Sequence, residues 1–375
     1  MLPRRKLKIH YRSTWPELIE FSNHAFYGGE LQAPPAAWDR DGDSDCPIRL
    51  VSLPDAVYSD KTNESEAEKV VEILDAIFRK PGTPPTIGVV TFNQPQSELI
   101  ETKLDEYADQ CKEFRIVYEQ QRQRRDGEED VGLFVKNLEN VQGDEREVMI
   151  FSTTFARKPD GRFHRYFGPI NFQGGERRLN VAITRSRSQK IVITSLPIND
   201  ISPRVFHDSL TPGEQYSGRD YLQLYIRYAQ AVSDGNANEA KLILDRARKL
   251  QEFEVEAGEK GEPESEFEIE VKDYIEKTFQ QQEDLRHLTL DSQVGCKGFR
   301  IDLAVRKTDS SGYLLGIECD GKSYHYSRTA RFRDIWRQDI LERYGWKIHR
   351  IWSPNWWLNP KGEIEKVVAK LRALT

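Results

Sequence analysis

The sequence predicts an α/β protein with two folded parts. Residues 1–198 are expected to form a doubly wound, mostly parallel sheet, and residues 265–375 a smaller mixed α/β domain. In the first part, apolar strand-like segments alternate with amphipathic helical segments, which is the order that a parallel sheet requires. Between the two parts, residues 199–264 contain two helical patterns followed by the charged linker "EAGEKGEPESE".

The elements of the first part follow from hydrophobic periodicity and from helix start and stop signals. "TIGVVTF" is a continuous apolar run, typical of a strand buried on both faces. The helical pattern before it places Val70, Leu74 and Phe78 on one face, and "PGTPP" ends it. In chain order we expect a strand at 7–10, a helix at 15–26, a strand at 48–53, a helix at 63–80, a strand at 86–92, a helix at 95–111, two strands within 132–155 and a strand at 190–196.

The remaining elements are mainly helical up to the linker and mixed after it. The last part has the order helix, strand, strand, helix, strand, helix, with the first two strands paired as a hairpin around "TDSSG". The expected helices are 219–235, 238–254, 266–281, 330–345 and one at the end of the chain, and the expected strands are 300–307, 313–320 and 346–352.

Charge is distributed unevenly along the chain. The net charge of −6 over 375 residues argues against nucleic-acid binding when it is taken alone. Yet Arg157–Arg187 contains eight Lys or Arg against two acidic residues, and Arg328–Arg350 contains seven against three. Such clusters suggest surfaces that bind a polyanion such as DNA, single-stranded or duplex, with solvated helix faces as the alternative.

Composition also restricts the cellular setting. No segment approaches the ~18 uninterrupted apolar residues of a membrane span, and the first residues have no apolar run typical of a secretory signal. The four cysteines form no C-x-x-C pair. We therefore expect a cytoplasmic protein without membrane association, zinc ribbon or disulfide framework.

Residues 316–323, "GIECDGKS", match the G-x-x-x-x-G-K-[ST] pattern of loops that bind phosphate. Such a loop directs backbone N–H groups at the anion, so its variable positions are usually small or neutral. Here Glu318 and Asp320 would stand beside the phosphates, and the strand pattern runs through Gly316. A small nucleotide hydrolase is therefore the weakest of the interpretations.

Carboxylates on the predicted hairpin indicate a different chemistry. Asp302 in "FRIDLAV" and Glu318 in "GIECD" lie on its two paired strands, where their oxygens can converge on a hard cation such as Mg²⁺. A cation held there stabilises charge on a phosphodiester and provides a hydroxide nucleophile. An acid in so apolar a strand is costly without a counter-ion. A solvated strand edge is the alternative.

The combination of "FRID", "IECDGKSYH", "RDIWRQDIL" and "GWKIHRIW" resembles the very-short-patch-repair-like endonucleases of the PD-(D/E)xK superfamily, from about Ser265 to Trp352. The resemblance implies a restriction-endonuclease-like fold and a site for Mg²⁺ (or Mn²⁺) at Asp302 and Glu318. It also implies a third ligand on the opening helix, with Glu268 as the first choice and Glu270 as the second.

This sequence departs from the superfamily pattern next to the expected site. Asp320 stands where most members have a lysine, so the residue that orients the attacking water stays open. The candidates are Asp320 as an extra ligand and His325 as a general acid or base, while Lys322 could restore the missing positive charge. These residues and the metal ligands are together the expected catalytic set.

The helix after the hairpin contains basic residues and is followed by a pair of tryptophans. By the same resemblance this helix lies beside the site, and Arg333 and Arg337 are interpreted as phosphate contacts. Salt bridges with Asp334 within the helix are an equal alternative. Trp356 and Trp357 are expected in the core rather than stacked on bases.

The strongest motif of the chain is "GGERRLNVAITRSR", residues 174–187. Guanidinium groups at a domain edge suit the γ-phosphate of a nucleotide held by a neighbouring domain, because Arg binds phosphate bidentately and stays charged. The segment resembles motif VI of superfamily 1 helicases, in the branch of the nonsense-decay and Okazaki-processing enzymes. The resemblance implies a second RecA-like domain with Arg178 and Arg185 at the nucleotide.

Two further segments support this resemblance, which covers about residues 7–197. "HYRSTWPELIEFSNHAFYGGEL" looks like motif IV, with Arg12 as a γ-phosphate ligand. "VKNLENVQGDEREVMIFS" looks like motif V, in which Glu145 reaches the ribose and Gln142 and Gly143 contact the bound strand. These helicases also need a first RecA-like domain with Walker A and B motifs, and no such motif precedes residue 7.

Two functional hypotheses follow. In the first, the chain is the C-terminal portion of a DNA helicase–nuclease, a fragment or truncated reading frame. Its last domain hydrolyses phosphodiesters, and ATP is bound only if the missing domain is supplied. In the second, both parts have lost catalytic turnover and the chain binds nucleic acid or a protein partner. Asp302, Glu318 and His325 are all present, which favours the enzyme.

Overall fold

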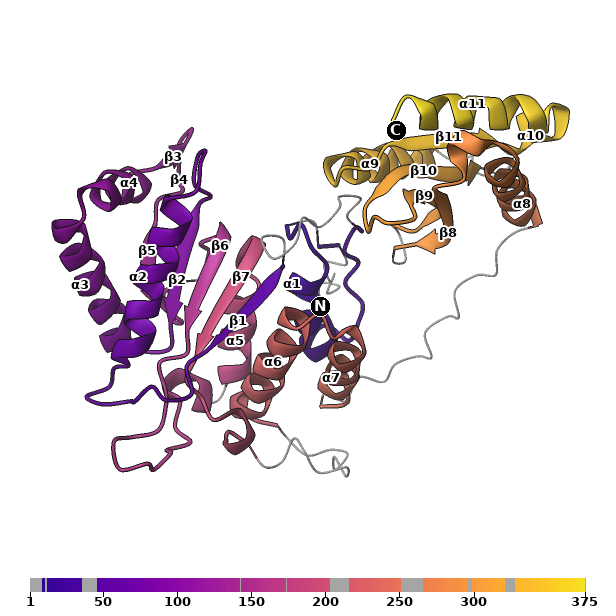
Figure 1. Cartoon of the computed structure of the whole chain (residues 1–375). Helices are drawn as coiled ribbons and strands as arrows, with labels where there is room; N and C mark the ends of the chain where they lie inside the picture. Colours follow the sequence, from indigo (N-terminus) through magenta and orange to yellow (C-terminus); the bar gives the residue numbers. More distant parts are fainter. Residues whose placement is uncertain are drawn as a thin grey trace. The chain divides into compact units, whose positions relative to one another are not determined.

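The computed structural model describes residues 9–10, 12–35, 46–141, 143–172, 174–202, 216–250, 266–295, 299–320 and 328–374, with the backbone alone at 266 and 328–335. The chain forms two compact units (Figure 1). We call residues 17–30 and 46–254 the five-stranded unit, and residues 1–16, 31–45 and 255–375 the four-stranded unit. The domain boundaries expected at residues 198 and 264 remain predictions, and the division into these two units differs from them.

The five-stranded unit contains the predicted parallel sheet. Its strands have the order β1-β7-β6-β2-β5, and each neighbouring pair is parallel. The interior strand β2 is buried at every residue, as its continuous apolar run predicts. The doubly wound α/β fold is confirmed. The strands are β1 (Ile48–Ser52), β2 (Ile87–Thr91), β5 (Phe134–Asn137), β6 (Arg146–Ser152) and β7 (Ser186–Thr194).

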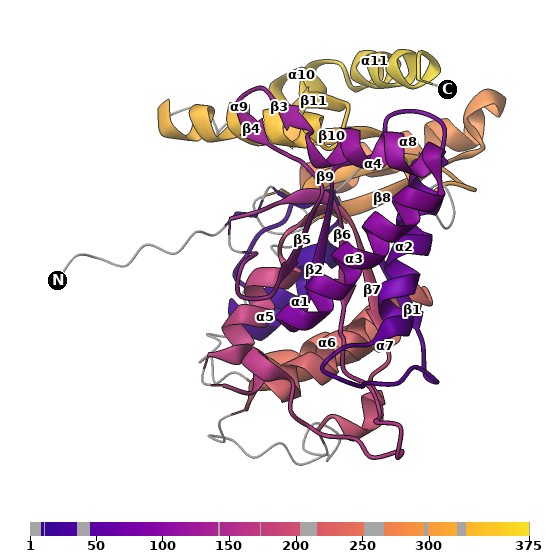
Figure 2. The same ribbon diagram turned by 90° about the vertical axis from the view of Figure 1, so that its left-hand side faces the viewer.

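Helices cover both faces of this sheet (Figure 1). On one face, α2 (Glu64–Phe78), α3 (Gln94–Gln110) and α4 (Lys112–Arg122) bury an apolar cluster against β2, β6 and β7. Figure 2 shows α2 and α3 in front of the strands. On the other side lie α1, α5 and α6, and α7 packs on α1 and α6. Their bounds are α1 (Glu17–Phe26), α5 (Gly175–Ile183), α6 (Gly218–Ser233) and α7 (Ala237–Lys249).

Several short elements complete the five-stranded unit. The helix α4 was not predicted, because Cys111 interrupts the pattern where α3 ends and α4 begins. A two-stranded ribbon also forms there, from β3 (Arg125–Asp126) and β4 (Glu129–Asp130). The 3₁₀ turns η2 (Gly168–Asn171) and η3 (Ile198–Asp200) flank α5 and β7.

The four-stranded unit has a mixed sheet with the order β11-β10-β9-β8. The predicted hairpin is its antiparallel β9–β10 pair, and β11 runs parallel to β10. The prediction of three strands was wrong, because "LTLDSQV" forms the antiparallel edge strand β8. Only one face of an edge strand of this kind packs on apolar groups, so its sequence is largely polar. The strands are β8 (Leu288–Val294), β9 (Ile301–Lys307), β10 (Tyr313–Asp320) and β11 (Ile348–Trp352).

One apolar cluster joins this sheet to helices α8, α10 and α11, with Trp356 fully buried among them. A second cluster lies between the sheet and α9 and includes Phe299, Leu341 and Trp346. The helices are α8 (Glu266–Gln281), α9 (Arg328–Arg343), α10 (Ser353–Leu358) and α11 (Pro360–Arg372), and the 3₁₀ turn η5 (Glu283–Leu285) follows α8.

The N-terminal segments belong to the four-stranded unit. Ile9 packs against the cluster beside α9. The Tyr344 hydroxyl donates to the carbonyl of Ser13 at 3.0 Å, and the Trp346 indole N–H donates to the carbonyl of Pro35 at 2.9 Å. In place of the strand predicted at 7–10, the described residues show a single parallel bridge from Ile9 to Gln32.

Among the helices that the structure describes, none combines the length and apolar character needed to cross a membrane.

Candidate active site

Asp302 and Glu318 occupy facing positions on neighbouring strands. The antiparallel register of β9 and β10 pairs Ala304 with Gly316 and Leu303 with Ile317, so Asp302 is the next residue opposite Glu318. Residues opposite each other in an antiparallel pair lie on the same face of the sheet, about 5 Å apart at Cβ. The hairpin therefore brings the two predicted ligands together, as the sequence indicates.

Asp302 is in a partly desolvated position. Its Oδ2 accepts a hydrogen bond from the backbone N–H of Cys319 at 2.8 Å. Burial, together with the negative charge of Glu318, raises the pKa of Asp302 to about 7, while the Cys319 hydrogen bond acts in the opposite direction. Two carboxylates so close together repel each other when both are ionised, and a cation between them would relieve that repulsion.

The two acids of β10 are buried and paired with arginines. Glu318 is 6% exposed and accepts from Nη2 of Arg337 at 2.9 Å. Asp320 is 8% exposed and accepts from Nη1 of Arg350 at 3.0 Å. Burial raises the pKa of Glu318, and Arg337 and Arg350 oppose that rise. Buried carboxylates of this kind need a positive partner, and here arginines provide it.

Glu268 lies near the pair. Its Oε2 accepts from Nε2 of Gln293 at 2.7 Å, and its charge contributes to the raised pKa of Asp302. Gln293 has φ 56°, a left-handed backbone conformation uncommon for a residue other than glycine. The alternative, Glu270, is exposed. The structure thus brings Glu268 towards Asp302, and its role as a ligand stays a prediction.

The donor set fits a hard cation in its chemistry. Asp302, Glu318 and Glu268 offer carboxylate oxygens, the ligands that Mg²⁺ and Mn²⁺ prefer. As the side chains of the described residues lie, no group of three or more His, Cys, Asp or Glu forms a ready metal site. Arginines pair with Glu318 and Asp320 instead.

Three residues predicted near this site fall outside what the structure describes, in whole or in their side chain. Lys322 and His325 lie in 321–327, outside the described residues, and the side chain of Arg333 is also outside them. The described residues of the segment 316–323 do not support a phosphate-binding loop. Strand β10 continues through Asp320, so Gly316 begins no loop.

Sequence reasoning missed Arg350 as a member of this site. Arg350 lies opposite Glu318 in the parallel β10–β11 register, and its Nε donates to Oε1 of Gln338 at 3.3 Å. A signal was present, since Arg350 is the one basic residue within the strand "IHRIW". Its pairing with Asp320 depends on which strand is adjacent, and the sequence did not establish that adjacency.

The two neighbouring tryptophans have different environments. Trp356 is fully buried and packs edge-on against Tyr274, so it is a core residue as predicted. Trp357 is 58% exposed and touches Phe267, so the prediction of a core position was wrong for it. Successive residues of a helix point in different directions, and here one ring faces the core while the next faces solvent.

In the five-stranded unit, Glu145 and Arg185, two of the four expected nucleotide-side residues, directly precede β6 and β7. The backbone N–H of Arg146 donates to the carbonyl of Arg185 at 3.3 Å. Glu145 forms an ion pair with Arg187 at 3.6 Å. The segments that resemble motifs V and VI therefore meet at one edge of the sheet, and Arg187 is a further basic residue at that edge.

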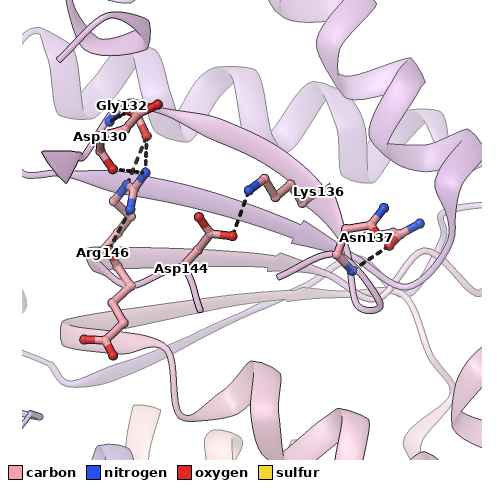
Figure 3. A network of polar contacts seen from close by, with 8 residues as sticks. Asp130, Gly132, Lys136, Asn137, Asp144 and Arg146 are labelled. Atoms are coloured by element: carbon pink, nitrogen blue, oxygen red, sulfur yellow. Dashed lines mark hydrogen bonds and ion pairs between the residues drawn. The ribbon is translucent and has the colours of Figure 1, made fainter. Parts of the chain in front are cut away.

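A polar network fixes the loop between β5 and β6 (Figure 3). Arg146 donates to the carbonyl of Gly132 through Nε at 3.0 Å and Nη2 at 2.8 Å, and its guanidinium lies 4.9 Å from the ring centroid of Phe134. Lys136 donates to Asp144 at 2.7 Å. Arg146 is 5% exposed, so its role is to hold the edge of the sheet rather than to meet a ligand.

The other motif residues are placed as follows. Arg178 on α5 pairs with Glu139 at 3.9 Å, and Nε of Arg185 donates to the carbonyl of Val181 at 2.8 Å. Gly143 has φ 97°, which suits the turn before β6. Gln142 lies outside the described residues. Arg12 belongs to the four-stranded unit, whereas the other motif residues belong to the five-stranded unit.

Comparisons with known proteins match two successive parts of the chain. A family model described as an AAA domain (AAA_12) matches residues 2–196, and the model REase_MTES_1575, a restriction-endonuclease-like domain, matches residues 267–371. Relatives include an uncharacterized ATP-dependent helicase, the MG140 homolog of Mycoplasma pneumoniae, 28% identical over 96% of this chain and 29% of its own length. MG140 of Mycoplasma genitalium is also 28% identical, over 97% of this chain and 29% of its own length.

A third relative matches only part of the chain. It is a regulator of nonsense transcripts 1 homolog from Neurospora crassa, 27% identical over 50% of this chain and 16% of its own length. The chain therefore spans less than a third of the length of the helicase relatives it matches. A helicase-family domain is followed in it by a restriction-endonuclease-like domain.

Proposed function

The chain belongs to the AAA_12 family of AAA domains, and from this premise we propose that it is a portion of a DNA helicase–nuclease. Its four-stranded unit would hydrolyse phosphodiesters of DNA with the help of Mg²⁺ or Mn²⁺. The observation that carries this proposal is the facing pair of Asp302 and Glu318 on β9 and β10, with Glu268 nearby.

Asp302 and Glu318 would hold the cation, with Glu268 as a third ligand. When bound, the cation would stabilise the negative charge that develops on the phosphate during hydrolysis. Cys319 keeps Asp302 oriented through its backbone N–H. His325, which follows the strand that carries Glu318, is the candidate to carry a proton, and Asp320 and Lys322 complete the proposed catalytic set.

The five-stranded unit would take part in ATP-driven movement on DNA. Arg178 and Arg185 would face the γ-phosphate and Glu145 the ribose of a nucleotide bound by a first RecA-like domain. We infer that the chain alone does not hydrolyse ATP. ATP turnover by the purified chain that disappears in Arg185→Ala would contradict this inference.

Plasmid cleavage tests the nuclease proposal. The full chain is incubated with supercoiled plasmid and Mg²⁺ or Mn²⁺, beside Glu318→Gln and the control Asp291→Asn. Asp291 is a carboxylate of the same sheet, paired with Arg306 at 2.7 Å and not assigned to the site. We expect metal-dependent nicking or linearisation by the wild type and the control, and none by Glu318→Gln.

A non-catalytic role in binding nucleic acid or a partner is the second candidate. Asp320 at the position of the usual lysine and the arginine pairs on both β10 acids favour it. Plasmid that is bound but not cut with either metal would support this role and reject the nuclease.

A further inference from the structure

The two acids of β10 share one arrangement. Each is nearly buried, and each accepts a hydrogen bond from an arginine of a different neighbouring element. Arg337 of α9 pairs with Glu318 at 2.9 Å, and Arg350 of β11 pairs with Asp320 at 3.0 Å. By strand alternation, Glu318 and Asp320 lie on the same face of β10.

The arginines are held in place by second acceptors. Arg337 also donates through Nη2 to the carbonyl of Arg300, the residue before β9, and Arg350 donates to Gln338. The side chains of Arg337 and Arg350 are 18% and 27% exposed. Surface ion pairs are usually mobile and contribute little, whereas these pairs are partly desolvated and anchored at two points.

A guanidinium and a divalent cation compete for Glu318. Arg337 holds Oε1 of Glu318, and two positive groups side by side in a desolvated site repel strongly. A buried carboxylate requires at least one of them. Arg337 therefore satisfies Glu318 as long as no cation is bound, and a cation that binds both oxygens of Glu318 would displace it.

We propose that Arg337 is an exchangeable counter-ion of Glu318, displaced by the divalent cation and then available to a DNA phosphate. The proposal rests on the proposed function and concerns the regulation of the same site. Arg binds phosphate well and remains charged at all relevant pH values. Displacement then links the two ligands, so that DNA increases affinity for the cation and the cation increases affinity for DNA by the same factor.

Calorimetric titration of the full chain with Mn²⁺ tests the exchange without any measurement of cleavage. We expect Arg337→Gln to bind Mn²⁺ about ten- to hundredfold more tightly than the wild type, because a hydrogen bond to a charged group contributes about 1.5–3 kcal/mol, and each 1.4 kcal/mol corresponds to a factor of ten. Arg306→Gln is the matched control, since Arg306 forms a similar pair with Asp291 on β8. It should bind Mn²⁺ like the wild type.

The same titration with a non-cleavable phosphorothioate duplex tests the linkage. DNA should tighten Mn²⁺ binding by the wild type and by Arg306→Gln, but not by Arg337→Gln. If Arg337→Gln fails to fold, Arg337→Lys replaces it. Lysine keeps the charge but lacks the planar fork that reaches Glu318 and Arg300 together, so it should also bind Mn²⁺ more tightly than the wild type.

The outcomes separate the two proposals. If the wild type binds no Mn²⁺, or if Glu318→Gln binds it equally well, the proposed metal site fails. If the wild type binds Mn²⁺ at Glu318, but the Arg337 variant binds no more tightly or retains the effect of DNA, only the exchange is overturned.

Discussion

The hydroxyl of Tyr344 and the backbone carbonyl of Ser13 form a hydrogen bond of 3.0 Å between residues 331 positions apart. Tyr344 is 7% exposed and belongs to the apolar cluster beside α9. The bond joins the end of α9 to a segment at the other end of the sequence, so the four-stranded unit is not contained within residues 265–375.

We expect Tyr344→Phe to lower the stability of the four-stranded unit by about 1 kcal/mol, the usual contribution of one hydrogen bond. Trp346→Phe should also lower it, because it loses the Pro35 contact of Trp346. Hydrogen exchange of β9 and β10, measured in urea, would compare both variants with the wild type. Unchanged protection in both variants would show that the segments with Ser13 and Pro35 do not stabilise the unit.

Asp302→Asn should reduce plasmid cleavage by about a hundredfold or more, the range seen when an electrostatic group is removed from an active site. Binding of DNA should be equal or tighter, since one negative charge fewer repels the phosphates. Cleavage and fluorescence anisotropy on one preparation separate these effects. A variant that no longer folds would instead assign Asp302 a structural role.

Lys190 predicts a pH dependence of stability. It lies on β7, is 1% exposed, and donates to the carbonyl of Leu18 at 3.4 Å. Burial lowers the pKa of Lys190 to about 7 from an ordinary value of 10.5. Between these two pKa values the unfolded chain binds more protons than the folded one. The free energy of unfolding should therefore rise with pH across that window and reach its full value above it.

Across the whole window the free energy of unfolding should change by roughly 5 kcal/mol, because each unit of the shift in the pKa of Lys190 corresponds to about 1.36 kcal/mol. Chemical unfolding of the wild type and of Lys190→Met, compared at pH 7 to 10, would measure it. The free energy of the Met variant should lack this component, since Met cannot titrate. Parallel curves for the two proteins would contradict the assignment.

Gly175 in the motif "GGERR" should not tolerate alanine. An added Cβ would lie 2.0 Å from the carbonyl oxygen of Ile170, which is backbone and cannot turn aside. Gly175→Ala should therefore cost about 1–3 kcal/mol, the range for overpacking. Arg177→Ala, at a side chain 88% exposed, should change stability by less than about 0.5 kcal/mol. Thermal melts of both variants compare them, and equal melting temperatures would reject the steric argument.

Trp356 and Trp357 should differ in the same way. Trp356→Ala removes a fully buried ring and should cost about 3–5 kcal/mol, whereas Trp357→Ala should cost much less. Denaturant unfolding of the two variants decides this, and similar losses would mean that Trp357 also supports the core.

Much of the fold was predictable from local patterns. The parallel sheet follows from apolar strand-like segments that alternate with amphipathic helices, and the β9–β10 hairpin follows from its turn. The edge strand β8 was missed because "LTLDSQV" is largely polar, and α4 because Cys111 separates it from α3 by a single residue. Local patterns do not encode which distant segments become neighbours. The contacts of Ile9 and Ser13 with the four-stranded unit are of this kind, so local patterns could not predict them.

The site shows the same division. Facing positions of Asp302 and Glu318 follow from the hairpin alone. The partners Arg337 and Arg350 come from α9 and β11, and their pairing depends on tertiary packing. Sequence reasoning thus located the acids but could not foresee what neutralises them.

The allocation of residues 1–16 and 31–45 to the four-stranded unit also bears on how such proteins can be recombined. The polypeptide passes from one unit to the other three times before residue 50 and once more near residue 254. A gene fusion that exchanged only the last hundred residues would separate Tyr344 and Trp346 from the carbonyls that evolved with them. Exchange of the whole four-stranded unit would require four breakpoints, one at each place where the polypeptide passes from one unit to the other.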